Sequence, residues 1–285
     1  MLAALIAGLA LGMEALPVGQ AKVTLNVKST PLEVFTYKPA NYRGERMIMV
    51  LHGTLRNAEE YRTNAQKMGE RFGALIVAPL FDAERFPSIR YQRGGITRRD
   101  GSAAPRDEWT YAFIPEIARQ IRDREGKPKM PYWLIGHSAG GQFLVRLAGF
   151  YGTDAERIVA ANAGSALFPT RDMPFGYGFG NLPAELSSDD VIRNYLAQPL
   201  TLYVGTLDSV PDQYFDESPE AMKQGEGRYQ RNLAVFKVAK ELAEARGWPF
   251  NWRVVEARAV AHDHQMMFDH PRAAQALFGT DRLAR

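Results

Sequence analysis

Residues 132–148 contain the pattern that most limits how this chain can fold. An apolar run at 132–135 is followed directly by Gly136-His137-Ser138-Ala139-Gly140, which reads G-x-S-x-G. Apolar positions at helical spacing continue through 142–148. This order predicts a buried strand, a sharp turn that carries the serine, and a helix. We expect larger side chains at Gly136 or Gly140 to collide with the neighbouring strand and helix.

Apolar strands alternate with helical segments along most of the chain. Strands are predicted at 23–27, 32–37, 47–51, 75–78, 133–135, 158–161, 200–204 and 252–255, and further helices at 57–72, 108–124, 228–246 and 265–278. The alternation predicts an α/β fold with a mostly parallel, doubly wound sheet of about eight strands and helices on both faces. The first two strands alternate in polarity, which fits an antiparallel hairpin at the sheet edge.

Length and composition fit one globular domain. The chain has 285 residues, of which 46% are hydrophobic and 24% charged, and we assign the domain to 22–285. Residues 1–21 resemble a secretory signal peptide, because an apolar run precedes the small-x-small site Gly19-Gln20-Ala21. The positive segment that usually opens such a signal is missing, and an N-terminal helix packed on the domain is the alternative. We expect a periplasmic or secreted protein, with a cytoplasmic one as the alternative. No other segment is long enough to span a membrane.

Charge and cysteine usage exclude several classes of site. The net charge is +3, and acidic and basic residues alternate, so no nucleic-acid-binding surface is predicted. The densest basic stretch, 90–99, is either a solvated loop or a rim that attracts an acidic substrate. The absence of cysteine excludes disulfides, a catalytic thiol and cysteine-ligated zinc. His262-x-His264 resembles a metal pair, but no nearby glutamate or third histidine completes it, and we expect no metal and no cofactor.

The segment 168–198 differs from the rest of the chain because it is rich in phenylalanine, glycine and proline. It lies between two predicted core strands and is expected to form a lid or wall of the substrate site, with a plain surface excursion as the alternative. Together with Trp109, Tyr111 and Phe113, its aromatic residues suggest a pocket for apolar or aromatic groups. The alternative for these aromatic residues is the core.

A serine hydroxyl needs a base within hydrogen-bond reach, and the base needs an acid that orients it. In strand–turn–helix serine sites the partners follow in the order serine, acid, histidine, each in a loop after a strand. Asp208 follows the strand at 200–204, with Asp212 as the alternative acid. His262 follows the strand at 252–255, with His264 as the alternative base. We predict that Ser138, Asp208 and His262 form a catalytic triad.

Other polar residues near these positions receive structural or supporting roles. Asp263 is expected to cap the last helix, and His270 to lie within it. His137 is expected to pack or bond locally. The oxyanion hole needs two backbone N–H donors. One is predicted at Ala139, directly after the serine, and the other at Thr54, in the loop His52-Gly53-Thr54 that follows a buried strand.

These motifs resemble the α/β-hydrolase superfamily over about residues 30–280. Val50-Leu51-His52-Gly53, Ala78-Pro79 and Gly136–Gly141 are similar to poly(3-hydroxybutyrate) depolymerase-like and feruloyl-esterase-like secreted esterases. The resemblance implies an α/β-hydrolase fold and hydrolysis of carboxylic esters through Ser138, Asp208 and His262. Polymer-degrading relatives usually carry disulfides and a substrate-binding domain, which this chain lacks, so we expect a small soluble ester as substrate.

The predicted function is therefore that of a serine carboxylesterase that forms an acyl-enzyme intermediate. The same triad also serves peptidases, amidases and acyltransferases, because the leaving group is recognised elsewhere. An alternative of another class is a binding module that has lost activity, since a fold does not by itself establish function.

Overall fold

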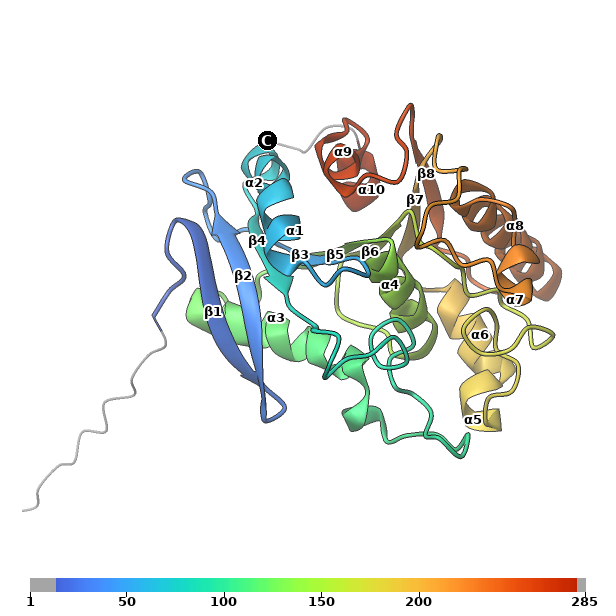
Figure 1. Ribbon diagram of the computed structural model, residues 1–285. Helices are drawn as coiled ribbons and strands as arrows, with labels where there is room; N and C mark the ends of the chain where they lie inside the picture. Colours follow the sequence, from blue (N-terminus) through green and yellow to red (C-terminus); the bar gives the residue numbers. More distant parts are fainter. Residues whose placement is uncertain (1–13, 281–285) are drawn as a thin grey trace, which may run out of the picture.

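The computed structural model describes residues 14–280, which form an eight-stranded sheet between two layers of helices (Figure 1). The strands are β1 (Gly19–Val27), β2 (Thr30–Lys38), β3 (Met47–Leu51), β4 (Leu75–Pro79), β5 (Tyr132–His137), β6 (Arg157–Ala161), β7 (Leu200–Gly205) and β8 (Arg253–Ala257). Their order in the sheet is β1-β2-β4-β3-β5-β6-β7-β8. All pairs from β4 to β8 are parallel, and β1 and β2 are antiparallel additions at one edge. The predicted fold class is confirmed.

The edge hairpin and the buried central strands follow the polarity of their sequences. Val27 pairs with Thr30 across a two-residue turn in which Lys28 and Ser29 both have positive φ, as a type I′ turn requires. In β3 and β4 every residue is buried, because helices cover both faces of the sheet there.

Helices cover the two faces of the sheet in separate groups. The helices are α1 (Ala58–Asn64), α2 (Gln66–Phe72), α3 (Phe113–Arg124), α4 (Ala139–Phe150), α5 (Ala184–Ser187), α6 (Asp189–Leu196), α7 (Pro219–Met222), α8 (Arg228–Arg246), α9 (His264–Asp269) and α10 (Ala273–Phe278). Apolar side chains of α1, α2, α9 and α10 share one core with Ile48 and Val50 of β3. Those of α3, α4, α6 and α8 share the other core with Met47 and Met49. The alternating side chains of one strand therefore supply both cores.

Three predicted helices are shorter than expected. The helix predicted at 265–278 divides into α9 and α10, and His270 lies between them, not within a helix. The physical reason is Pro271, which has no N–H and holds the preceding residue in an extended conformation, with ψ of 141° at His270. The segment 57–72 divides at Ala65 into α1 and α2, and 108–124 begins with two 3₁₀ turns before α3.

The segment 168–198 is not one loop, because it contains α5 and α6. Before these helices, Phe175 and Phe179 pack on Phe150 of α4, with ring centroids 5.5 and 5.1 Å apart. Tyr195 of α6 is fully buried and contacts Phe179. Most of the aromatic residues in this segment therefore belong to the core, which sequence periodicity did not reveal because the chain between β6 and α5 is irregular.

The first 13 residues of the predicted signal peptide lie outside the described residues. Residue Leu16 is buried, its N–H donates to Oε1 of Glu125 at 3.0 Å, and its carbonyl accepts from Nζ of Lys38 at 2.9 Å. Residues 19–21, the predicted cleavage site, are the first three of β1 and pair with β2. Among the described residues, no helix has the length and apolar character needed to cross a membrane.

Candidate active site

The residues predicted to carry chemistry lie in loops at the carboxyl ends of parallel strands. The loops after β3, β5, β7 and β8 contain Thr54, Ser138, Asp208 and His262 respectively. Because neighbouring parallel strands end at the same edge of a sheet, segments far apart in sequence meet there. This edge is where ligands bind in open α/β sheets.

Ser138 occupies the sharp turn between β5 and α4 that the sequence predicted. Its φ of 57° and ψ of −116° form a strained conformation that non-glycine residues rarely adopt. A Cβ atom at Gly136 would lie 2.5 Å from the Gly140 backbone, and one at Gly140 would lie 2.3 Å from the carbonyl oxygen of Leu51. The predicted collisions are confirmed, and both glycines are needed for β3, β5 and α4 to approach closely.

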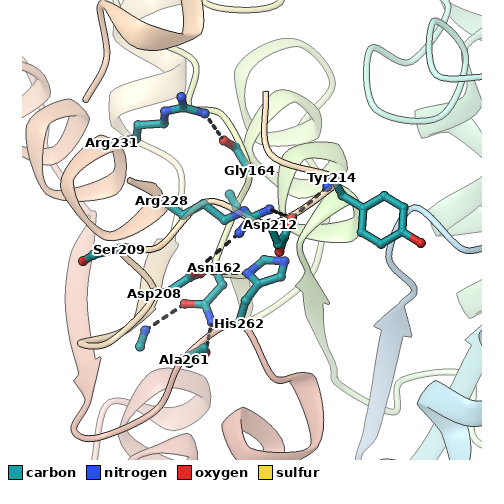
Figure 2. A network of polar contacts seen from close by, with 12 residues as sticks. Asn162, Gly164, Asp208, Ser209, Asp212, Tyr214, Arg228, Arg231, Ala261 and His262 are labelled. Carbon is teal, nitrogen blue, oxygen red and sulfur yellow. Dashed lines mark hydrogen bonds and ion pairs between the residues drawn. The ribbon is translucent and has the colours of Figure 1, made fainter. Parts of the chain in front are cut away.

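His262 and Asp208 form a hydrogen bond, with Nδ1 of the imidazole 2.8 Å from Oδ2 of the carboxylate (Figure 2). A carboxylate accepts hydrogen bonds, so Nδ1 carries the proton and Nε2 is left as the basic atom. Asp208 is 2% exposed. His262 is half-buried and lines a cavity of about 310 Å³ together with Ser138.

The alternative acid, Asp212, is linked to Asp208 through Arg228. The guanidinium of Arg228 lies 3.4 Å from Oδ1 of Asp208 and 2.8 Å from Oδ1 of Asp212 (Figure 2). Burial works against the ionised form of Asp212, but hydrogen bonds from Arg228 and from the Tyr214 N–H give it a net lowered pKa. The carboxylate that contacts the His262 imidazole is that of Asp208.

The alternative base, His264, contacts different residues from those that His262 contacts. Its ring stacks on Tyr61 with centroids 4.0 Å apart, and Nε2 lies 2.8 Å from Nδ2 of Asn64 and 3.6 Å from Glu60. Burial lowers the pKa of His264. His264 therefore supports the wall of the cavity from the first turn of α9. The same turn is capped by Asp263, which accepts from the Met266 N–H at 2.8 Å as predicted.

Asn162, which follows β6, connects the loops that carry the acid and the histidine. Its Oδ1 accepts from the Gly205 N–H at 2.7 Å, and its Nδ2 donates to the Ala261 carbonyl at 3.0 Å (Figure 2). The residue is 1% exposed and has a positive φ of 44°. Asn162 thus fixes the carboxyl ends of β7 and β8 relative to each other.

His137 packs beneath His262, with ring centroids 4.4 Å apart. It is buried, its Nδ1 lies 3.3 Å from the Tyr61 hydroxyl, and burial holds its pKa well below the usual value. His137 is therefore neutral and forms part of the support below the site, in agreement with the local role expected for it.

The two predicted oxyanion residues line one cavity of about 120 Å³ together with Ser138. Ala139 is the first residue of α4, where helical N–H groups have no partner within the helix. Thr54 lies in a turn that is closed by a hydrogen bond, in which the Arg56 N–H donates to the Gly53 carbonyl at 3.3 Å. Both residues therefore border the space next to the serine.

His52 fixes that turn from below. Nδ1 of His52 lies 3.0 Å from the Gly53 carbonyl, and Nε2 accepts from the Phe81 N–H at 3.1 Å. Burial lowers the pKa of His52 to about 3, so the ring is neutral and Nδ1 carries its proton. The Tyr91 hydroxyl donates to the His52 carbonyl at 2.8 Å.

The structure decides between the alternatives for the aromatic residues and for the basic stretch. Trp109, Tyr111 and Phe113 are buried in the core, which was the alternative for them. The basic stretch 90–99 divides into two parts. Arg90, Arg98 and Arg99 line an open groove of about 850 Å³, whereas Arg93 lines a small cavity next to the site. Within residues 14–280, no cluster of three or more histidine or acidic side chains could hold a metal ion.

Three residues at the site were not predicted from the sequence: Asn162, Tyr214 and Arg228. Tyr214 borders both cavities that contain Ser138. The position of Asn162 directly after a predicted strand was the available indication, because residues there reach the functional edge of a parallel sheet. Arg228 begins a helix and has no local pattern that distinguishes it from a surface arginine.

Comparisons with solved structures place the chain in a family. Poly(aspartic acid) hydrolase-1 from Sphingomonas sp. KT-1 has a TM-score of 0.83 and 30% identity, covering 88% of this chain and 96% of that chain. LpqC, a poly(3-hydroxybutyrate) depolymerase from Bordetella parapertussis, has a TM-score of 0.84 and 29% identity, covering 94% and 93%. Siderophore hydrolase EstA from Aspergillus nidulans shares the fold, with a TM-score of 0.51 and 17% identity over 88% and 92% of the two chains. No protein-family model and no curated protein sequence matches this chain.

The chain belongs to the α/β-hydrolase superfamily, and it is a hydrolase. The predicted resemblance to poly(3-hydroxybutyrate) depolymerase-like enzymes is confirmed.

Proposed function

We propose that this enzyme cleaves carboxylic esters with a Ser138–His262–Asp208 triad through an acyl-enzyme intermediate. The observation that carries the proposal is the 2.8 Å bond between Asp208 and Nδ1 of His262, in a site whose cavity also contains the strained Ser138. The bond leaves Nε2 of His262 free to accept a proton from a hydroxyl.

In the proposed reaction, Nε2 of His262 removes the Ser138 proton as Oγ attacks the ester carbonyl carbon. Asp208 stabilises the imidazolium that forms, and the N–H groups of Ala139 and Thr54 stabilise the oxyanion. The C–O bond to the alcohol then breaks, and the imidazolium protonates the leaving alkoxide. Water, deprotonated by the same imidazole, attacks the acyl-enzyme and releases the acid and free Ser138.

Hydrolysis of p-nitrophenyl esters from acetate to palmitate tests this proposal, with Ser138→Ala as the inactive variant. Turnover that is lost in Ser138→Ala supports the triad, and the best chain length measures the size of the acyl site. A fluorophosphonate probe provides a second readout, because it reacts with an activated serine whatever the substrate. A protein that neither turns over esters nor reacts with the probe would be a binding module, and the proposal would then be wrong.

Amide hydrolysis is the second candidate for the same triad. The relative with 30% identity is named for action on poly(aspartic acid), whose backbone consists of amide bonds. Incubation with poly(aspartic acid), followed by size-exclusion chromatography, tests this candidate. A shift to smaller products with the wild type and none with Ser138→Ala would favour it.

We also propose export across the inner membrane, directed by residues 1–21. Support comes from the sequence pattern alone, and cleavage after Ala21 would remove the first three residues of β1. Mass spectrometry of the intact protein isolated from the periplasm and the medium tests export and gives the mature N-terminus. A protein that retains residue 1 and stays in the cytoplasm would contradict it.

A further inference from the structure

A small polar cavity adjoins the space next to the nucleophile. Its volume is about 200 Å³. Gln92, Gln142 and Asp216 line both this cavity and the one that contains Ser138 and Ala139. The two glutamines bond to each other, with Nε2 of Gln92 3.2 Å from Oε1 of Gln142. A substrate held at Ser138 can therefore extend into the second cavity past these side chains.

The wall of the second cavity contains a buried guanidinium that has only neutral partners. Arg146 is 2% exposed. Its Nη1 donates to the Gln142 carbonyl at 3.0 Å, and its Nη2 donates to Oγ of Ser165 at 2.9 Å and to the Gly176 carbonyl. Its Nε has no partner in the described residues. A buried charge is costly unless an opposite charge offsets it, so this arginine is suited to binding an anion.

A second arginine, Arg93, borders the same cavity. It is half-buried, and its guanidinium carbon lies 5.9 Å from the centroid of the Tyr177 ring. Within residues 14–280, neither Arg93 nor Arg146 forms an ion pair with a carboxylate. The one acidic residue in the wall, Asp216, is occupied, because its two oxygens accept from the Tyr177 hydroxyl at 2.7 Å and the Ser218 N–H at 3.1 Å.

We infer that Arg93 and Arg146 bind a carboxylate group of the substrate, so that the enzyme prefers esters or amides with an anionic carboxylate near the bond that is cleaved. The expected preference in kcat/KM rests on the proposed function. Binding of a carboxylate by Arg93 and Arg146 does not. Burial lowers the pKa of Arg146 to about 10, which leaves it charged at neutral pH. Arg93 and Arg146 form no ion pair within residues 14–280, and the single carboxylate in the wall, that of Asp216, is bonded to Tyr177 and Ser218. The two guanidinium groups therefore favour a substrate carboxylate over an apolar group.

The spacing along α4 limits the distance between the two groups of the substrate. Ser138, Gln142 and Arg146 follow one another at intervals of four residues, which places them on one side of the helix. Eight residues correspond to about 12 Å along the axis, and the Arg146 side chain reaches back toward the Gln142 carbonyl. The anionic group is therefore a few bonds from the scissile carbonyl.

Matched pairs of esters test the inference. The monoethyl esters of succinic, glutaric and adipic acids are each compared with the ethyl ester in which a methyl group replaces the carboxylate, and the released acid is titrated. We expect the wild type to have the higher kcat/KM for the anionic ester in at least one pair. We expect Arg93→Gln to lower the anionic-to-neutral ratio about ten- to hundredfold, as for loss of a charged hydrogen bond. A wild-type preference for the neutral ester in all three pairs would overturn the inference.

Arg43→Gln is the matched control. Arg43 is exposed in the loop before β3, at the opposite end of the strands from Ser138. Arg43→Gln and Arg93→Gln change the net charge of the protein by the same amount. Arg93→Gln is preferred to Arg146→Gln because the Arg93 side chain is only half-buried. Equal ratios in Arg93→Gln and Arg43→Gln would also overturn the inference.

Calorimetry separates failure of the inference from failure of the proposed function. Monoethyl glutarate is titrated into Ser138→Ala, and then into Ser138→Ala combined with Arg93→Gln or with Arg43→Gln. We expect the Arg93 variant to bind at least tenfold more weakly and the Arg43 variant to bind as Ser138→Ala does. Equal affinities would overturn the inference even if ester hydrolysis is established, whereas the expected pattern would support it even if no ester is cleaved.

Discussion

Asp208 and His262 are 54 residues apart in the sequence, yet their side chains meet at 2.8 Å. They meet because β7 and β8 are adjacent parallel strands, in which Gly205 pairs with Ala257. Asn162 then holds the two loops together through Gly205 and Ala261. The contact is therefore a property of the sheet, reinforced by one buried amide.

Replacement of the acid distinguishes Asp208 from Asp212. We expect Asp208→Asn to lower kcat/KM by about 10⁴, because an amide favours the wrong tautomer of His262. We expect Asp212→Asn to cost less than tenfold, since Asp212 contacts Arg228 and not the imidazole. Steady-state kinetics on one p-nitrophenyl ester decides between them. Equal losses in the two variants would contradict the assignment of Asp208.

Replacement of Ser138, the proposed nucleophile, is expected to abolish the chemical step. We expect Ser138→Ala to lower kcat by about 10⁴ to 10⁶, because no acyl-enzyme forms. The melting temperature is expected to stay at or above that of the wild type, since alanine removes no packing contact. Ser102→Ala, at an exposed residue, is the control. Retained turnover in Ser138→Ala would refute the mechanism.

Asn162 is predicted to be a positioning residue. Asn162→Asp keeps the acceptor for the Gly205 N–H but loses the donor to the Ala261 carbonyl. We expect kcat to fall with little change in KM, and the free energy of unfolding to fall by about 1–3 kcal/mol. Kinetics and urea unfolding measure the two effects. An unchanged kcat in a destabilised variant would show that Asn162 acts on the fold alone.

Gly140, two residues after Ser138, is predicted to be needed for packing. In Gly140→Ala the new Cβ meets the backbone carbonyl oxygens of Leu51 and His52, which cannot move without displacing β3. We expect the free energy of unfolding to fall by about 1–3 kcal/mol or more. The control is Gly149→Ala in the same helix, where the nearest atom is the end of the flexible Leu167 side chain. Thermal unfolding that ranks Gly149→Ala as the worse variant would contradict this.

Acid is predicted to destabilise the fold through His52. Its pKa is about 3 in the folded protein and 6.5 in the unfolded chain, so only the unfolded chain binds this proton between those pH values. Stability is therefore lost as the pH falls from 6.5 toward 3, by up to about 1.4 kcal/mol per pH unit. Urea unfolding at pH 7, 6, 5 and 4.5 measures the slope. His52→Gln keeps an acceptor for the Phe81 N–H. In this variant the pH dependence of the free energy of unfolding should decrease by up to about 1.4 kcal/mol per pH unit, which corresponds to one proton. An unchanged pH dependence would contradict the role of His52.

The fold and the strained turn that carries Ser138 were predictable because their determinants are local in sequence. A buried parallel strand is apolar throughout, as at Met47–Leu51, and the Ser138 turn requires glycines at fixed positions. Helix boundaries were less accurate at 265–278, although Pro271 was visible, because periodicity extended across it. The sequence left the aromatic residues at 168–179 open between a pocket and the core, since an irregular chain has no period that shows which side chains are buried.

The sequence by itself determined the fold class, the turn that carries Ser138 and the placement of Asp208 and His262 after strands, because periodicity, strand ends and glycine positions are set by neighbours along the chain. Only the tertiary structure decided which acid contacts which histidine. Asp208 and Asp212, like His262 and His264, are separated by a few residues with similar local chemistry, and the register of β7 with β8 selects between them. The pairing of Arg228 with two carboxylates and the unpaired charge of Arg146 were decided in the same way, because burial and charge balance depend on residues that meet only in the folded chain.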